Sequence, residues 1–198
     1  MPASEASPNV LFLIDDQHRY DWLGCAGAEF LRTPNIDRLA ARGRRFTHCF
    51  TNSPVCGPAR CSLATGLLPT RLGTLSNETS FLPISVPTIY KHFRDHGYRV
   101  SLVGRHDLSK TGSPASVHGN RPLNFSYGFT EAFEVEGGMA VSRLDEPNGP
   151  YGAYLKEVAW WEAYREDFRA RSDKGWILGA SHDSVLPAEH HQDAFVGR

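Results

Sequence analysis

The chain has 198 residues, 40% of them hydrophobic, and a formal net charge of −1 from 21 Lys and Arg against 22 Asp and Glu. The balanced charge excludes a basic nucleic-acid-binding surface along the whole chain, and the hydrophobic content excludes wholesale disorder. No stretch approaches the roughly 18 apolar residues of a membrane span. We therefore expect one large or two small globular domains, with neither a nucleic acid nor a membrane as partner.

The N-terminus and the cysteines indicate a reducing compartment. Residues 1–9 lack a basic segment, and the apolar run that follows is too short for a signal peptide. The four cysteines, at positions 25, 49, 56 and 61, lie in the first third of a chain too long to depend on disulfides. We expect free thiols and a cytoplasmic location.

The first fifty residues predict a strand, a helix and a second strand. Val10–Ile14 is a short, unbroken apolar run, which is typical of a fully buried strand. The helix that follows has Thr33 as its N-cap, Pro34 at its first position and Gly43 past its end. Arg45–Phe50 is predicted as the second strand.

Two helices and a third strand are predicted next. A short helix begins at Pro58 and ends before Gly66, and a longer one covers Thr88–His96 and is closed by Gly97. Tyr98–Val103 is predicted as a buried strand. Because strands alternate with helices, the sequence predicts an α/β domain with a largely parallel sheet.

The remaining residues are less regular. Thr111–Gly152 lacks periodicity and is predicted as an irregular excursion from the core, whereas Tyr154–Arg171 has a helical pattern. Pro187–Val196 resembles the beginning of another helix. A long irregular segment is unusual in a compact domain unless other parts of the protein hold it. We therefore expect the isolated chain to expose apolar surface, to be marginally stable and to lack useful hydrolytic activity.

Polar residues that follow the predicted strands or begin a helix are candidates for one shared site. They are Asp15-Asp16, Cys56–Arg60 and Arg105–Asp107. In open α/β sheets, ligands bind at the carboxyl ends of the strands. The paired carboxylates suit a hard cation such as Ca²⁺ or Mg²⁺, although a solvated turn with Asp15 capping a backbone amide explains the pair equally well.

The segment Cys56–Arg60 carries a thiol at the start of a helix. The unpaired amides and positive end of a helix suit a reactive thiol or an oxyanion, and Arg60 would add a fixed positive charge. The alternative is a buried structural cysteine. A zinc site formed by His48, Cys49, Cys56 and Cys61 is disfavoured, because the spacings fit no standard close pair.

Three segments resemble the N-terminal part of type I sulfatases, which are hydrolases of the alkaline-phosphatase superfamily. They are Pro8–Gln17, Thr33–Ala40 and Ser53–Arg60, in the family's order and spacing. The family signature is Cys-x-Pro-x-Arg, commonly with Ser at the fourth place, where this chain has Ala59. Leu102–Leu108 resembles the later Gly-Lys segment more loosely, with Arg105 at the usual lysine and Asp107 where many members carry histidine.

The resemblance implies a three-layer α/β/α sandwich with a mostly parallel sheet, of which residues 1–198 form the N-terminal part. The core would cover about residues 8–110. Family members usually run to several hundred residues, and a second Asp-Asn metal pair, a substrate-facing histidine and a further lysine normally lie beyond the region covered here. We therefore expect this chain to be part of a longer enzyme.

The resemblance also implies a mechanism of sulfate ester hydrolysis. Cys56 would be oxidised by a formylglycine-generating enzyme, and the hydrated aldehyde of formylglycine would attack sulfur. Asp15, Asp16 and the converted Cys56 would hold a divalent cation, expected to be Ca²⁺, with Mg²⁺ or Mn²⁺ possible. Arg60 would orient the hydrate, Arg105 would offset charge on the sulfuryl oxygens, and Asp107 would position that arginine or transfer a proton.

Two other functions stay open at this point. A phosphodiesterase or phosphonate monoester hydrolase on the same scaffold needs the same cation and nucleophile. A non-catalytic remnant that binds anions or a partner protein is the other alternative. The sequence does not name the substrate alcohol, which could belong to a sugar or another small molecule, and it leaves the oligomeric state open.

Overall fold

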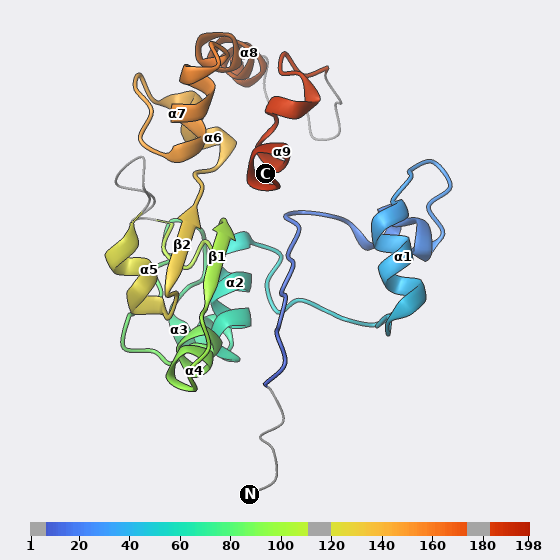
Figure 1. Ribbon diagram of the computed structural model, residues 1–198, viewed down its shortest axis with the longest axis vertical. Coiled ribbons are helices and arrows are strands. Elements are labelled where there is room, and N and C mark those ends of the chain that lie inside the picture. The colour runs from blue at the N-terminus through green and yellow to red at the C-terminus, as the bar shows by residue number, and fades with distance from the viewer. Residues whose placement is uncertain (1–6, 111–119, 174–182) are drawn as a thin grey trace, which may run out of the picture. The chain divides into compact units, whose positions relative to one another are not determined.

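The computed structural model describes residues 7–110, 120–173 and 183–198. The chain divides into two compact units, Met1–Thr51 and Asn52–Arg198 (Figure 1). No helix in the described ranges is long and apolar enough to cross a membrane.

The N-terminal unit is built from short helices. They are η1 (Tyr20–Trp22), η2 (Gly24–Ala26) and α1 (Pro34–Arg42). The predicted start of α1 at Pro34 and its end before Gly43 are confirmed. Thr33 is the N-cap residue, as predicted, but its hydroxyl makes no capping bond: it donates to Asp37 Oδ1 at 2.9 Å and accepts the Gly24 amide at 2.8 Å. These bonds tie α1 to η2 instead of closing the helix end.

Two predicted strands of this unit are not formed. Val10–Ile14 has no strand partner, and its side chains are 43–82% exposed. Arg45–Phe50 is also irregular, with Phe46 and Phe50 largely exposed. A strand needs the backbone of a neighbouring strand, and residues 7–51 form none for either segment to pair with. The apolar pattern alone could not supply that partner.

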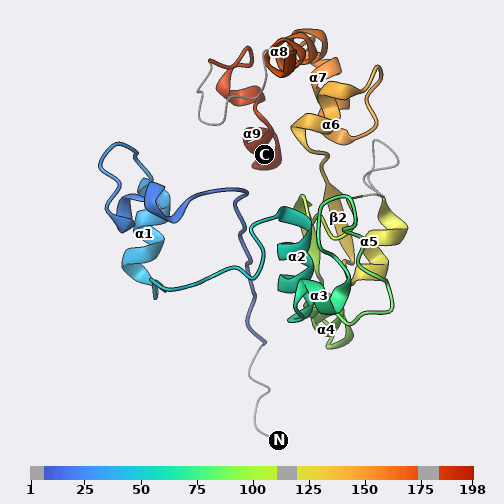
Figure 2. The same cartoon turned by 180° about the vertical axis from the view of Figure 1, so that it is seen from behind.

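The second unit contains a parallel pair of strands, β1 (Ser101–Gly104) and β2 (Glu131–Glu134). The two strands lie side by side in both views, with Ser101 opposite Glu131 (Figures 1 and 2). The strand predicted over Tyr98–Val103 is confirmed but begins later, at Ser101, and the prediction that it is buried is wrong, because Ser101 and Val103 are exposed. The predicted α/β class with a parallel sheet is also confirmed.

Four helices accompany this pair of strands. They are α2 (Cys56–Thr65), α3 (Pro69–Leu72), α4 (Ile89–Asp95) and α5 (Arg121–Tyr127). Helix α2 begins two residues before the predicted Pro58, and Gly66 ends it with a positive φ of 71°, as predicted. Thr88, predicted inside α4, is its N-cap and accepts the Lys91 amide at 3.1 Å. Helix α2 packs against α3 and α4.

The predicted irregular excursion over residues 111–152 is wrong where the structure describes it, from residue 120. This stretch contains α5, β2, α6 (Gly138–Arg143) and the first residues of α7. Asn120 caps α5 by accepting the Leu123 amide at 3.2 Å, and Gly128 ends α5 with a φ of 114°. Such short elements are held by caps rather than by a long apolar stripe, so they leave little periodicity in the sequence.

The predicted helix over residues 154–171 is two helices, α7 (Pro150–Glu157) and α8 (Trp161–Asp173). The break falls at Ala159, whose φ of 62° lies in the left-handed region and cannot continue a helix. Near the C-terminus, η3 (Ala188–His190) and α9 (Gln192–Val196) match the predicted beginning of a helix.

The second unit has two hydrophobic clusters. The first comprises Cys61, Ala64, Leu82, Leu108, Tyr127 and Phe129. The second comprises Val135, Val141, Tyr151, Leu155, Trp161 and Leu186. Because Cys61 and Leu108 both belong to the first cluster, it joins α2 to the loop after β1. This packing positions the site described next.

Candidate active site

Cys56 is the first residue of α2 and is half-buried. The helix ladder starts directly before it, since the Ala59 amide donates to the Val55 carbonyl at 3.0 Å. The Gly57 amide donates to Asn77 Oδ1 at 3.1 Å, which satisfies one of the free donors at this helix end. The Cys56 side chain therefore lies at the positive end of the helix dipole.

Helix α2 packs closely against the rest of the unit through Gly57 and Cys61. A Cβ on Gly57 would lie 2.5 Å from Ser80 Cβ, so only glycine permits this approach. The buried Cys61 thiol contacts Ser80 Oγ at 3.7 Å and the Leu108 carbonyl at 3.8 Å. Burial raises the pKa of Cys61, which keeps this thiol neutral and unreactive. Cys61 is thus a packing residue, whereas Cys56 is accessible.

Arg60 lies one helical turn after Cys56 and is 12% exposed. Its Nη1 donates to the carbonyl of Arg105 at 2.9 Å. Residues four apart on a helix share a face, so Arg60 is on the same side of α2 as Cys56. The hydrogen bond joins that face to the loop after β1.

The loop after β1 brings three cations to one carboxylate. Arg105 Nη2 donates to both oxygens of Asp107, at 2.9 and 3.1 Å. Lys110 Nζ lies 3.2 Å and Arg60 Nε 3.8 Å from Asp107 Oδ2. The loop turns through Gly104 and Asp107, whose φ values of 97° and 52° are both positive. For Asp107 this conformation is uncommon, and the ion pairs compensate for it.

The electrostatics keep Asp107 ionised. The carboxylate is 7% exposed, and this burial by itself would raise the pKa of Asp107. Arg105, Lys110 and Arg60 oppose the effect and hold the pKa of Asp107 below its ordinary value. A carboxylate oxygen of Asp107 also lies within 4.8 Å of Cys56 Sγ. The anion therefore anchors a cluster of positive charge next to the thiol.

The His106 side chain makes hydrogen bonds in a separate network that also holds this loop. Its Nδ1 accepts the Leu108 amide at 2.9 Å, so the ring proton is on Nε2. Nε2 lies 2.7 Å from Asn124 Oδ1 and 3.0 Å from Glu134 Oε1. Burial raises the pKa of Glu134, but hydrogen bonds from His106 and Asn124 hold it below its ordinary value. This buried network fixes the loop against β2 and α5.

Gly137 leaves space for the side chain of Arg105. A Cβ on Gly137 would lie 3.0 Å from Arg105 Nη1 and 3.1 Å from its Cζ. Gly137 has an ordinary φ of −73°, so the close approach of the guanidinium, not the backbone, explains a residue without a side chain here.

The structure brings together four predicted site residues, Cys56, Arg60, Arg105 and Asp107, within the second unit. Asp15 and Asp16 lie in the N-terminal unit. The donor chemistry of this pair fits a hard cation, because both supply carboxylate oxygens. Asp15 is exposed, and its Oδ2 lies 2.5 Å from His18 Nδ1.

The sequence did not indicate Asn77, Ser80, Lys110 or Glu134, because their roles depend on contacts across the chain. Among these, Lys110 had a local signal, since it lies three residues after the predicted Arg105–Asp107 segment. His106 lies inside that segment, but its bonds to Asn124 and Glu134 could not be predicted.

A sequence model described as sulfatase matches residues 8–185. The chain belongs to the sulfatase family. It is 37% identical over 190 residues to the uncharacterized sulfatase YidJ of Escherichia coli, which covers 89% of this chain and 38% of that protein. It is 36% identical over 112 residues to the choline-sulfatase of Rhizobium meliloti, covering 57% of this chain and 21% of that protein. This sulfatase chain thus spans less than two fifths of the length of these relatives.

The fold is similar to that of the phosphonate monoester hydrolase of Agrobacterium radiobacter, with a TM-score of 0.60 and 22% identity. The match covers 91% of this chain and 34% of the hydrolase. The predicted sulfatase family and the predicted alkaline-phosphatase-like α/β fold are both confirmed.

Proposed function

We propose that the enzyme to which this sulfatase chain contributes hydrolyses sulfate esters and that Cys56 is the position of its nucleophile. One observation carries the proposal: the Cys56 thiol lies at the start of α2, within 4.8 Å of the carboxylate that holds Arg105. A nucleophile, the positive end of a helix and fixed cations together suit attack on an anionic ester. Membership of the sulfatase family supports sulfate as the ester group.

The proposed nucleophile is formylglycine, made from Cys56 by a formylglycine-generating enzyme. The conversion removes the thiol sulfur as sulfide and oxidises Cβ by two electrons, so the maturation enzyme must use an oxidant such as dioxygen. When formed, formylglycine supplies a hydrated aldehyde whose hydroxyl can attack sulfur. The half-buried position of Cys56 leaves the side chain accessible for this chemistry.

Arg60 orients the group at position 56 in this proposal. It shares a face of α2 with Cys56, and its bond to the Arg105 carbonyl restrains the guanidinium. Because arginine stays charged and presents several fixed donors, Arg60 can hold an oxyanion without giving up a proton.

Arg105 binds the sulfuryl oxygens, and Asp107 is its positioning residue. Charge increases on these oxygens as the ester bond breaks, so a donor already in place stabilises the transition state most. Asp107 holds the Arg105 guanidinium by hydrogen bonds, and Gly137 leaves space for the guanidinium because it has no side chain.

Asp15 and Asp16 would hold a divalent cation, with Ca²⁺ expected and Mg²⁺ or Mn²⁺ as alternatives, together with an oxygen of the converted Cys56. When bound, the cation polarises a sulfate oxygen.

Phosphonate monoester or phosphodiester hydrolysis is the second candidate. The cluster of Arg60, Arg105 and Lys110 offers donors to any tetrahedral oxyanion, and the fold is shared with a phosphonate monoester hydrolase. A 22% identity supports only the shared fold, so sulfate remains the first choice.

The test is a comparison of substrates. The complete enzyme that contains this chain is co-expressed with a formylglycine-generating enzyme, supplied with Ca²⁺ and assayed with an aryl sulfate, an aryl phosphonate monoester and an aryl phosphodiester. We expect the highest kcat/KM on the sulfate, its loss in Cys56→Ala, and its retention in Cys49→Ala, which removes an exposed thiol. Preference for either phosphorus ester supports the second candidate. Sulfate binding without turnover on any ester supports a non-catalytic protein.

A further inference from the structure

Lys110 stands at the edge of the cluster, and its backbone is firmly held. The Lys110 amide donates to the Ser80 carbonyl at 2.9 Å, and the Leu82 amide donates to the Leu108 carbonyl at 2.8 Å. An antiparallel bridge pairs Phe81 with Ser109 between these two bonds. Because Ser80 also packs against Gly57 of α2, one short segment sets the position of Lys110 relative to the start of the helix that carries Cys56.

The Lys110 ammonium faces the same carboxylate as the two arginines. The Asp107 side chain is 7% exposed, whereas Lys110 is 21% and Arg105 is 29% exposed. The carboxylate is therefore less exposed to solvent than the Lys110 and Arg105 side chains that pair with it. An anion approaching from solvent meets the cations before it meets Asp107.

Lys110 is the most adaptable of the three cations. Arg105 binds both oxygens of Asp107, and Arg60 is also bonded to a backbone carbonyl. The described side-chain contact of Lys110 is the single ion pair with Asp107. Lysine has rotatable donors on a flexible stem, so its ammonium can turn to a new anion while its backbone stays fixed. An anion bound at the exposed side of these side chains would therefore meet the Lys110 ammonium beside the two guanidinium groups.

We propose that Lys110 is a substrate-binding residue that contacts the anionic sulfuryl group of the ester, as a third cation beside Arg60 and Arg105. The inference rests on the proposed hydrolysis for the identity of the substrate. The binding of an oxyanion by Lys110 can be tested without turnover.

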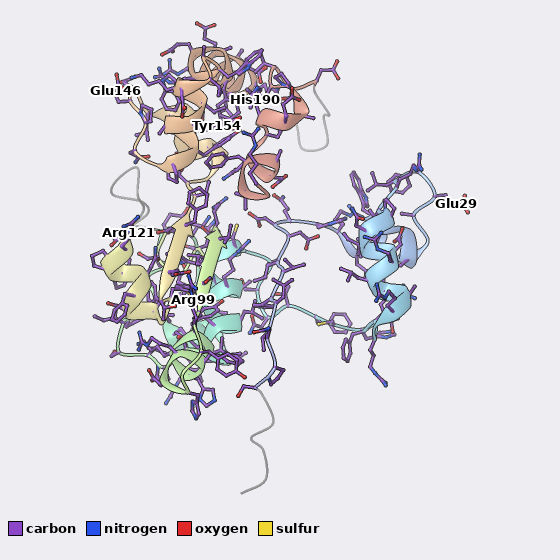
Figure 3. All side chains as sticks on the ribbon, in the orientation of Figure 1. Glu29, Arg99, Arg121, Glu146, Tyr154 and His190 are labelled. Carbon is purple, nitrogen blue, oxygen red and sulfur yellow. The ribbon has the colours of Figure 1, made fainter. Side chains whose placement is uncertain are left out.

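The experiment measures binding of inorganic sulfate by isothermal titration calorimetry at low ionic strength, and KM and kcat for an aryl sulfate. The variants are Lys110→Met, Lys110→Gln and Lys110→Arg. The control is Lys156→Met, because Lys156 also pairs with a carboxylate, that of the exposed Glu146 (Figure 3). Circular dichroism and thermal melts report folding of each variant.

We expect Lys110→Met and Lys110→Gln to raise the Kd for sulfate and the KM about tenfold, with kcat within about threefold. Lys110→Arg should stay within about threefold of the wild type in Kd, because the charge is kept, and Lys156→Met should be unchanged. If Lys110→Met is misfolded, Lys110→Gln decides the comparison. Wild-type Kd and KM in a folded neutral variant overturn the inference, as does a wild type that binds no sulfate. A wild type that binds sulfate through Lys110 but hydrolyses no ester instead overturns the proposed function alone.

Discussion

Asp107→Asn removes the charge at the centre of the site while keeping the size of the side chain. The carboxylate accepts hydrogen bonds from Arg105 at 2.9 and 3.1 Å and pairs with Lys110 at 3.2 Å and Arg60 at 3.8 Å. An asparagine oxygen can still accept from Arg105, but its NH₂ group has nothing to offer the remaining cations. Three positive groups would then repel one another around a neutral amide.

The expected loss in the free energy of unfolding is about 2 kcal/mol. Hydrogen bonds to charged groups contribute about 1.5–3 kcal/mol, and breaking a fully buried ion pair costs about 3–5 kcal/mol. The cations here are 12–29% exposed and can turn to water, so the expected loss lies in the range for hydrogen bonds to charged groups and not in the range for buried ion pairs.

The loss should depend on pH in a defined direction. The pKa of Asp107 is lowered in the fold, so its stabilisation is fully present above the pKa of an unfolded aspartate, about 3.9. It disappears as the pH falls through the lower folded value. The difference between wild type and Asp107→Asn should therefore be full at pH 7 and should shrink progressively as the pH falls below about 4.

Urea unfolding followed by circular dichroism, at pH 7 and at a pH below about 4, measures this difference in the free energy of unfolding. The control is Glu131→Gln, which breaks the pair with Arg99 where the two strands begin (Figure 3). Both of those side chains are at least half exposed, so the control should leave the free energy of unfolding at pH 7 close to that of the wild type. An Asp107→Asn protein as stable as the control, or a difference that persists unchanged at low pH, would refute the reasoning.

Three further predictions concern packing and alkaline pH. Gly57→Ala should destabilise the protein by about 1–3 kcal/mol, measured by urea unfolding, because the added Cβ meets Ser80. Gly137→Ala should lower kcat several-fold with little change in Tm, since the new methyl group displaces the Arg105 guanidinium; an unchanged kcat would argue against that role. Burial raises the pKa of Tyr127 to about 12, so the wild type should lose stability as pH rises from 10 to 12, where the unfolded chain releases the phenol proton first. Tyr127→Phe should show a shallower loss in melts over that interval.

The helix boundaries could be predicted because local stereochemistry sets them. Pro34 begins α1, and Gly66 ends α2 in the left-handed conformation that glycine favours. Val10–Ile14 has an equally strong apolar pattern, yet it forms no strand, since a strand also depends on a partner elsewhere in the chain. The break between α7 and α8 at Ala159 could not be predicted either, because alanine favours a helix and rarely adopts a positive φ.

The same distinction holds for the candidate site. Cys56 and Arg60 were predictable because both lie in one short segment at the start of a helix, where free amides and a nearby arginine suit a reactive thiol or an oxyanion. Asn77 and Ser80 were not, because they reach Gly57 from a loop some twenty residues away. Lys110 joins the cluster only because backbone bonds clamp its segment to residues 80–82.

The central claim, that Cys56 becomes the nucleophile, is tested most directly by the mass of the peptide that contains it. Trypsin should release residues 46–60, which include Cys49 as well as Cys56, so fragment ions must locate any change. In active protein made with a formylglycine-generating enzyme, we predict a mass about 18 Da lower at position 56 and an unmodified thiol at position 49. A free thiol at position 56 in protein that hydrolyses the sulfate ester at full rate would contradict the claim.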